Sequence, residues 1–302
     1  MRPKSLTFSL ALAFTALWVS RAGAAYESTP FPPAHEIFAP LQADPTEPHF
    51  AFQLGIPVSH RLLAQVDVGG YLGLYRWAFP GNIGAAQLNL GGAILTRFDG
   101  TPSHSLQVID YYGNVPLDVR IGPVSGRFMF YHDSSHLGDD YLREKNIQSI
   151  DHSWEALRAI LSVQPWSFVR VYGGYTNALH TKPAWEGRQA VQGGTEIYFN
   201  SSEKAFIHPY WANDVQAWQR STWDPTWTSQ LGIKTGTESS RGRGISYFVQ
   251  FRTGPRYEGQ FFEDHETVWA VGLKFELSQT LFSPAATPEP LPPPTPPATP
   301  AL

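Results

Sequence analysis

Residues 267–277 read TVWAVGLKFEL, and residues 245–252 read ISYFVQFR. In both stretches large apolar residues alternate with polar or small ones. Successive side chains of a β-strand point to opposite faces, so this period of two predicts strands with one apolar and one polar face. The same period runs through twelve segments whose breaks carry Gly, Pro, Asn, Asp or Ser: 49–57, 62–77, 85–96, 104–121, 124–134, 150–163, 166–177, 187–199, 204–217, 225–235, 243–253 and 266–278. The second and fourth segments leave open a division into two strands each.

The number and polarity of these segments indicate the fold class. Strands of about ten residues that alternate apolar and polar residues, in an even count, are typical of transmembrane β-barrels. We therefore predict an all-β fold, an antiparallel transmembrane β-barrel of about 12 strands over residues 49–278. A soluble β-sandwich also alternates and is the alternative fold. Charged side chains are costly against lipid, so the barrel hypothesis places five of them in the lumen: Asp67, Asp110, Asp118, Arg158 and Glu196.

The last predicted strand carries a more specific signal. GLKFEL at 272–277 resembles the closing strand of bacterial outer-membrane barrels, with a glycine, two free positions and then alternating large apolar residues. Ala270 departs from that signal, because a polar residue is usual there, and the chain continues beyond the strand. The resemblance implies a place in the outer membrane of a Gram-negative bacterium.

The two ends of the chain have a different character. Residues 1–24 have the parts of a cleaved secretory signal peptide: positive Arg2 and Lys4, the apolar run SLTFSLALAFTALWV, and the cleavage site AGA. We expect export across the inner membrane followed by insertion into the outer membrane. Residues 25–48 form a Pro-rich N-terminal arm and residues 279–302 a Pro-rich periplasmic tail, since such composition favours extended chain over a packed core. The tail is available for contacts with periplasmic components.

The composition excludes several functional classes. The chain has 0 Cys, so thiol and zinc-thiolate chemistry are absent. A formal net charge of −4 argues against nucleic acid as a partner, because nucleic-acid binding depends on basic patches. With 16% charged and 14% aromatic residues, membrane lipids are the partners that we expect.

Candidate catalytic residues follow from strand parity. In the 124–134 segment Arg127 belongs in the lumen, so the even-numbered positions, Phe128 and Phe130 among them, face lipid. His132 and Ser134 continue that face at the end of the strand. Glu155 has outward parity at the start of the next strand. A serine, a histidine and a carboxylate on one face are the elements of an activated nucleophile. The alternative is a set of polar strand ends that bind lipid headgroups.

This hairpin resembles outer-membrane phospholipase A, a family of twelve-stranded barrels. The stretch 132–134, His-Asp-Ser, matches the family's histidine–any–serine motif, and 153–155, Ser-Trp-Glu, resembles its serine-tryptophan-asparagine. The resemblance covers one hairpin and implies that Ser134 is the nucleophile, His132 the base and Glu155 the residue that orients the base.

Two departures from the family leave alternatives open. The family has asparagine-glycine after its serine, whereas this chain has Ser135 and His136, which are secondary catalytic candidates. Calcium assists catalysis in the phospholipase family, and the carboxylates of Asp139 and Asp140 are ligands that a hard cation accepts. An acidic solvated loop explains the same two residues without a metal, so the sequence requires no cofactor.

A second resemblance covers most of the chain. The strings FPPAHEIFAPLQADPTEPHF, YHDSSHLGDDYL and SWEAL resemble an uncharacterised family of bacterial β proteins, the domain of unknown function 1207. That family implies an outer-membrane location and brings no activity. Two functional hypotheses therefore stand: a phospholipase-like lipid or ester hydrolase at the outer-leaflet rim, and a non-catalytic barrel that acts as a narrow pore or binds a partner.

Overall fold

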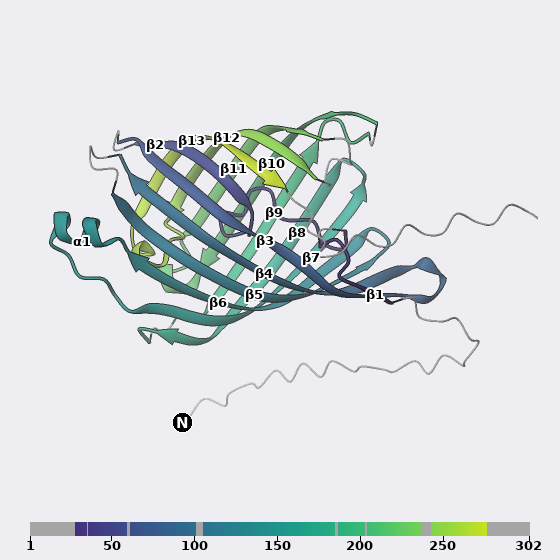
Figure 1. Cartoon of the computed structure of the whole chain (residues 1–302), viewed down its shortest axis with the longest axis horizontal. Helices are drawn as coiled ribbons and strands as arrows, with labels where there is room; N and C mark the ends of the chain where they lie inside the picture. The colour runs from purple at the N-terminus through teal and green to yellow at the C-terminus, as the bar shows by residue number, and fades with distance from the viewer. Residues whose placement is uncertain are drawn as a thin grey trace, which may run out of the picture.

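The computed structural model describes residues 28–276, apart from 35, 59–60, 101–104, 185–186, 203 and 237–242. The predicted signal peptide at 1–24 and the predicted tail at 279–302 lie outside the described residues. Figure 1 shows the described chain as a closed barrel of long, tilted strands.

Twelve antiparallel strands, β2 to β13, form the barrel in sequence order, and β13 pairs with β2 to close it. In lipid no water is available to hydrogen-bond the backbone of an unpaired edge strand. Closure of the barrel pairs these backbone groups with a neighbouring strand. One short strand, β1 (Ser28–Pro30), pairs with the end of β3. The barrel strands are β2 (Phe50–Pro57), β3 (Leu63–Ala78), β4 (Gly84–Asp99), β5 (Leu106–Ile121), β6 (Val124–Leu137), β7 (His152–Trp166), β8 (Val169–Lys182), β9 (Gln189–Tyr198), β10 (Ile207–Trp218), β11 (Pro225–Thr235), β12 (Gly244–Pro255) and β13 (His265–Glu276).

All twelve predicted segments are strands, and the barrel is confirmed. The second and fourth segments do not divide, since β3 and β5 each run unbroken for 16 residues. The predicted luminal charges lie inside: Asp67, Asp110, Asp118, Arg158 and Glu196 are each at most 7% exposed. The outer face is apolar and open to the surroundings, which rules out the soluble β-sandwich. A sandwich buries its apolar face, whereas Phe128 is 51% exposed.

The two ends of the barrel differ. At the end where β2 begins and β13 finishes, called here the terminal end, two of the turns have only two residues, 122–123 and 167–168. The opposite end, called here the loop end, carries the longer connections 138–151 and 256–264. They contain the helix α1 (Asp139–Lys145) and the 3-10 turn η3 (Gly259–Phe261). The other short turns are η1 (Pro80–Asn82) and η2 (Gln219–Ser221). No helix among the described residues has the length and apolar character needed to cross a bilayer.

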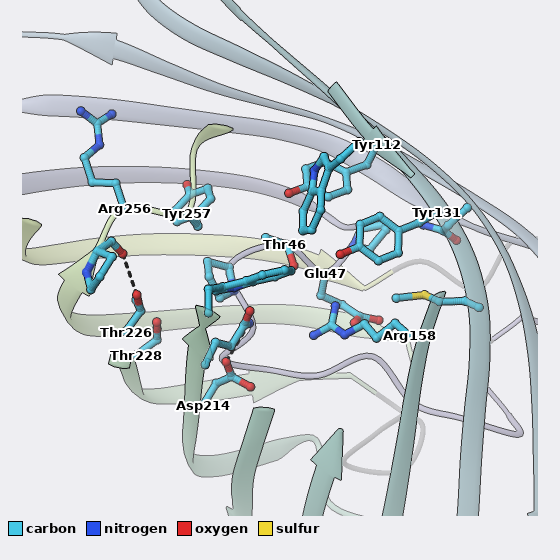
Figure 2. Close-up of a pocket in the computed structure, with 18 of the residues that line it drawn as sticks. Thr46, Glu47, Tyr112, Tyr131, Arg158, Asp214, Thr226, Thr228, Arg256 and Tyr257 are labelled. Atoms are coloured by element: carbon cyan, nitrogen blue, oxygen red, sulfur yellow. Dashed lines mark hydrogen bonds between the residues drawn. The ribbon is translucent and has the colours of Figure 1, made fainter. Parts of the chain in front are cut away.

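The N-terminal arm lies inside the barrel, a position that the sequence pattern does not predict. Phe38, Leu41 and Asp44 are at most 1% exposed although none of them belongs to a strand. The arm runs into the lumen from the terminal end and returns there to start β2, and Figure 1 shows its dark trace within the ring of strands. Its innermost turn brings Thr46 and Glu47 beside a pocket in the lumen (Figure 2).

The composition of the arm explains why a polar lumen holds it. Proline has no N–H, so the five prolines between residues 31 and 49 leave the arm with more acceptors than donors. The barrel wall supplies the missing donors from long basic and amide side chains. The bonds to arm carbonyls include Gln87 Nε2 to Pro33 (3.0 Å), Arg170 Nη1 to Pro40 (3.2 Å) and Lys274 Nζ to Gln42 (2.6 Å).

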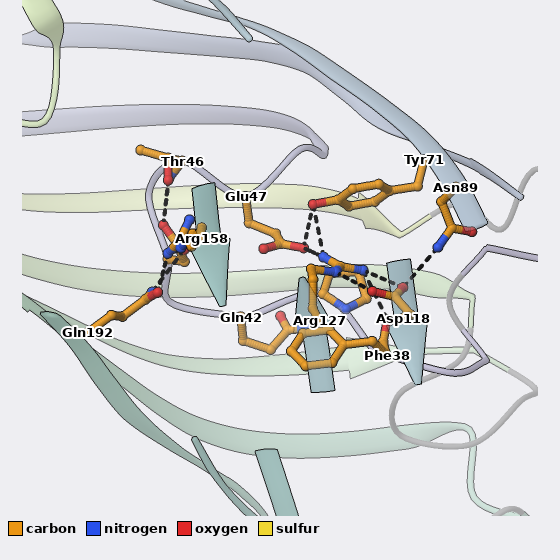
Figure 3. A network of polar contacts seen from close by, with 12 residues as sticks. Phe38, Gln42, Thr46, Glu47, Tyr71, Asn89, Asp118, Arg127, Arg158 and Gln192 are labelled. Carbon is orange, nitrogen blue, oxygen red and sulfur yellow. Dashed lines mark hydrogen bonds and ion pairs between the residues drawn. The ribbon is translucent and has the colours of Figure 1, made fainter. Parts of the chain in front are cut away.

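Two carboxylates fix the inner turn of the arm to the wall (Figure 3). Asp44 accepts a hydrogen bond from Arg158 at 2.7 Å and also accepts from its own neighbour, the Thr46 backbone N–H, at 2.9 Å. Glu47 forms an ion pair with Arg127 at 3.0 Å. Burial is the largest influence on Asp44 and would raise its pKa, but the Arg158 guanidinium and the hydrogen bonds from Thr46 and Gln192 together outweigh it, so the pKa is lowered. The carboxylate therefore stays charged, and the pair is a buried salt bridge.

Asp44→Asn tests this anchor, because it leaves the buried Arg158 charge without its partner. Breaking one side of a buried pair costs about 3 kcal/mol of unfolding free energy. The control is Glu36→Gln, since the Glu36–Arg76 pair is half-exposed, with a side-chain exposure of 53% for Glu36, and such pairs contribute about 1 kcal/mol or less. Urea unfolding of the refolded barrel in micelles measures both. Equal losses in the two variants would contradict the anchor.

Candidate active site

Strands β6 and β7 place the predicted catalytic residues on the outer wall, near the loop end. The antiparallel register pairs His132 with Glu155 and Ser134 with Ser153. Alternation sends these side chains outward, since their neighbours Asp133 and Trp154 are 1% and 2% exposed. The side chains of His132 and Glu155 are 46% and 32% exposed. The sequence-based prediction of which face each residue occupies is therefore confirmed.

The histidine and the carboxylate are in contact. His132 Nδ1 lies 3.0 Å from Glu155 Oε1, which is a hydrogen bond between direct cross-strand partners. A carboxylate that accepts from Nδ1–H fixes the tautomer of the ring and leaves Nε2 free to accept a proton. Two of the three predicted residues thus have the geometry of an oriented base.

A second histidine, which the sequence does not single out, reaches the same carboxylate. His180 Nδ1 on β8 lies 3.4 Å from Glu155 Oε2. A bulge produces this contact, because Ala156 pairs with Ala178 while Glu155 pairs with His180, and Leu179 is left between them. The extra residue sends both Leu179 and His180 outward. Glu155 therefore bridges two imidazoles on a wall that is largely apolar.

The serine has a different partner from the predicted one. Ser134 Oγ hydrogen-bonds with His136 Nε2 at 2.9 Å, and no hydrogen bond joins Ser134 to His132 within the described residues. His136 in turn packs edge-on against Tyr111 of β5, with ring centroids 5.9 Å apart. The secondary candidate His136 is thus the histidine that contacts the serine, and His132 is the one that contacts the carboxylate.

The other secondary candidate, Ser135, faces the lumen. Its hydroxyl donates to Asp110 and accepts from the Gln260 N–H of η3 at 3.1 Å, and the residue is fully buried. Gln260 also donates to the Ser135 carbonyl at 2.6 Å. A residue held in this way does not reach lipid, so Ser135 supports β6 from behind and leaves the outer wall to Ser134.

Buried aromatic residues support the hairpin from the same side. The indole N–H of Trp154 donates to Asp133 at 2.6 Å. Trp154 also packs against Trp218 of β10 with ring centroids 4.6 Å apart. Because Asp133 lies between His132 and Ser134 in sequence, and Trp154 lies beside Glu155, this contact fixes the spacing of the outward residues.

The predicted calcium ligands do not form a donor set. Asp139 and Asp140 begin α1, where Asp140 pairs with Arg143 on the helix surface. Glu144 accepts a hydrogen bond from Ser105 at 3.1 Å. Within the described ranges no group of three or more His, Asp or Glu side chains is placed to hold a metal ion. The calcium site therefore stays a prediction, and the mechanism proposed for this hairpin uses no metal.

Comparison with known proteins identifies the family. The model of "Protein of unknown function (DUF1207)" matches residues 13–277. The chain belongs to this family. The resemblance found in the arm and in the hairpin is therefore confirmed over most of the chain. No curated protein sequence matches the chain.

Several solved outer-membrane barrels are similar to this DUF1207 protein at low identity. The outer membrane phospholipase dimer of Salmonella typhi is 11% identical, with a TM-score of 0.49 over 80% of this chain and 94% of that one. Outer membrane phospholipase A from Escherichia coli is 11% identical, with a TM-score of 0.48 over 76% and 94%. The NanC porin is 12% identical, with a TM-score of 0.46 over 76% and 100%. These barrels include both an enzyme and a porin, so they assign no activity.

Single cysteines test the two faces of β6, since the chain has 0 Cys and carries no background thiol. We expect Ser134→Cys to react with a maleimide in the folded protein, because its side chain points out of the barrel. Ser135→Cys, one residue along and buried, reacts only after unfolding. Mass spectrometry of the labelled protein measures both. Equal labelling of the two folded variants would mean that the parity is wrong.

Proposed function

We propose that this protein is an outer-membrane hydrolase of lipid esters, with its active site on the outer wall of the barrel. One observation carries the proposal: His132 Nδ1 is held by Glu155 at 3.0 Å on a lipid-facing surface, two residues from a serine on the same face. An ionised carboxylate beside hydrocarbon costs free energy. A role in orienting a catalytic base accounts for that cost.

The residues suggest a sequence of proton transfers. Ser134 turns from His136 to His132, and Nε2 of His132 accepts the hydroxyl proton while Oγ bonds to the ester carbonyl carbon. The imidazolium, stabilised by Glu155, then gives that proton to the departing alcohol as the ester C–O bond breaks. His132 then accepts a proton from a water molecule, whose oxygen bonds to the acyl carbon. The proton passes to Ser134 Oγ as the bond to the fatty acid breaks. The two steps together consume one water molecule and use no metal or cofactor.

The surrounding wall supports a lipid substrate. Phe128 and Phe130 precede His132 on the outward face and are 51% and 42% exposed. Acyl chains that lie along them bring an ester linkage, which sits near the membrane surface, to the level of Ser134. In this proposal the terminal end of the barrel faces the periplasm, so the loop end faces outward and the substrate is a lipid of the outer leaflet.

The pore hypothesis is less well supported than the hydrolase. The arm fills the lumen and is bonded to the wall along its length, and the chamber left beside its inner turn has a volume of only about 40 Å³. An ion path needs the arm to leave the barrel. A closed barrel that only binds a partner remains the alternative, and the absence of esterase activity would favour it.

Hydrolysis of an ester-labelled phospholipid by refolded protein tests the proposal. We expect Ser134→Ala and His132→Ala to lower kcat by about 10³-fold or more, since removal of a nucleophile or its base has that effect. Glu155→Ala lowers kcat by about 10²-fold or more through loss of the orienting group. The matched control Ser153→Ala, the cross-strand partner of Ser134, keeps its activity.

His136→Ala separates the two histidines. If His132 is the base, this variant keeps most of its activity, because it loses only the resting partner of Ser134. Loss of activity in His136→Ala with retention in His132→Ala would contradict the assignment of the base. Wild-type protein without activity on any ester would contradict the proposed function as a whole.

A further inference from the structure

A cleft opens at the loop end of the barrel, where the connection between β2 and β3, the end of β4 and the helix α1 come together. Figure 1 shows α1 at this end of the barrel. Six charged side chains line the cleft: Arg61, Arg97, Asp99, Lys145, Arg256 and Glu266. Four of the six are cations. None of them belongs to the outer-wall cluster around Glu155, so the cleft is a separate feature of the molecule.

The floor of the cleft holds three arginines around two carboxylates. Arg97 bonds to Glu266 at 2.7 Å and to Glu258 at 3.2 Å. Arg256 bonds to the same Glu258 at 3.2 Å, and Arg252 lies 3.9 Å from Glu266. Burial would raise the pKa of Glu258, but Arg256 and Arg97 outweigh it and hold the pKa well below its usual range. The electrostatic potential at the floor is therefore positive although two acids are present.

Two further cations stand at the rim of the cleft without a carboxylate partner. Arg61 and Lys145 are both exposed, and neither forms an ion pair within the part of the chain that the structure describes. The nearby acids are Asp99, which lines the cleft, and Asp264, which is 61% exposed and lies 4.0 Å from Arg256. Cations that line one cleft repel each other, so an anion between them is stabilised.

A chain of hydrogen bonds provides a hydroxyl donor in the same lining. A guanidinium can only donate, so Arg256 Nη2 donates to Gln107 Oε1 at 3.3 Å. This bond orients the amide, and Gln107 Nε2 therefore donates to the Tyr141 hydroxyl oxygen at 3.0 Å. Tyr141 keeps its own hydrogen to donate, and no described residue accepts it. Cations together with a free O–H donor are the groups that bind an oxyanion.

The volume and the position of the cleft limit the anion. The cleft has a volume of about 170 Å³. One water molecule needs about 15 Å³ of such space, so a tetrahedral phosphoryl group has ample room. Leu62 lines the cleft and is 50% exposed, and the nearby Val58 is 63% exposed. These apolar side chains suit hydrocarbon, so the cleft lies at the level where the headgroups of a bilayer meet water.

We propose that this cleft binds a phosphoryl group, either as free phosphate or as the headgroup of a phosphorylated lipid. Arg61 and Lys145 supply the positive charges that the protein itself leaves without partners, and the Tyr141 O–H donates to a phosphoryl oxygen. A phosphate monoester suits two such cations, because it carries a charge of about −1.5 to −2 at neutral pH. The site shares no residue with the proposed active site, and neither depends on the other being correct.

Isothermal titration calorimetry of the full mature chain, refolded in maltoside micelles without phosphate, tests the site. Inorganic phosphate is one ligand, and dihexanoyl phosphatidic acid below its critical micelle concentration is the other. We expect saturable binding of both. If a lipid is the source, the phosphatidic acid binds about tenfold tighter, because its short chains bury apolar surface against Leu62. Equal or weaker binding of the lipid identifies free phosphate as the source. No binding of either ligand overturns the proposal.

Variants distinguish the cleft from the net charge of the protein. Arg61→Gln combined with Lys145→Gln raises the dissociation constant for phosphate at least about tenfold, and Tyr141→Phe raises it about threefold or more. The control combines Arg143→Gln with Lys182→Gln, which removes the same charge from exposed ion pairs outside the cleft and keeps wild-type affinity. Heat-modifiable migration on gels verifies that each variant is folded. Equal losses in the two double variants, or unchanged binding in the first double variant and in Tyr141→Phe, would overturn the assignment.

Discussion

The Arg127 guanidinium joins the N-terminal arm to three neighbouring parts of the barrel wall, its own strand β6, β5 and β3. It bonds to Asp118 of β5 at 2.8 Å, to Glu47 of the arm at 3.0 Å and to the Tyr71 hydroxyl of β3 at 3.0 Å. It also lies 4.5 Å from the ring centroid of Phe38 (Figure 3). Its burial therefore fixes the arm inside the lumen. It also fixes the orientation of β6, because a strand with Arg127 inside must have His132 and Ser134 outside.

This one orientation separates the molecule into two polar systems. The inner system joins arm and wall and fills the lumen, so the fold has a polar core where a soluble protein has an apolar one. The outer system is a small cluster around Glu155 on an apolar wall. The two meet in the β6–β7 hairpin, whose inward residues Asp133 and Trp154 alternate with the outward ones. Rigid support of this kind from buried contacts is what a catalytic group on a membrane-facing strand requires.

Local patterns in the sequence predict much of this arrangement. The period of two gives the strands, and the parity of Arg127 gives the face of His132, since both are local properties of one segment. The place of the arm is not local, because its prolines show an extended chain but not the basic wall that holds it. His180 is missed because a bulge at Leu179 changes its face. The partner of Ser134 is not predictable either, since His132 and His136 stand at equal spacing on either side of it.

Covalent labelling of Ser134 tests the proposed active site most directly. Folded protein in micelles is treated with a long-chain alkyl fluorophosphonate, which reacts with serines that an oriented base activates, and the modified peptide is located by mass spectrometry. The account predicts one adduct, on Ser134, that is absent from His132→Ala and from the unfolded chain. An unlabelled Ser134, or labelling spread equally over Ser134 and the neighbouring Ser153, would contradict it.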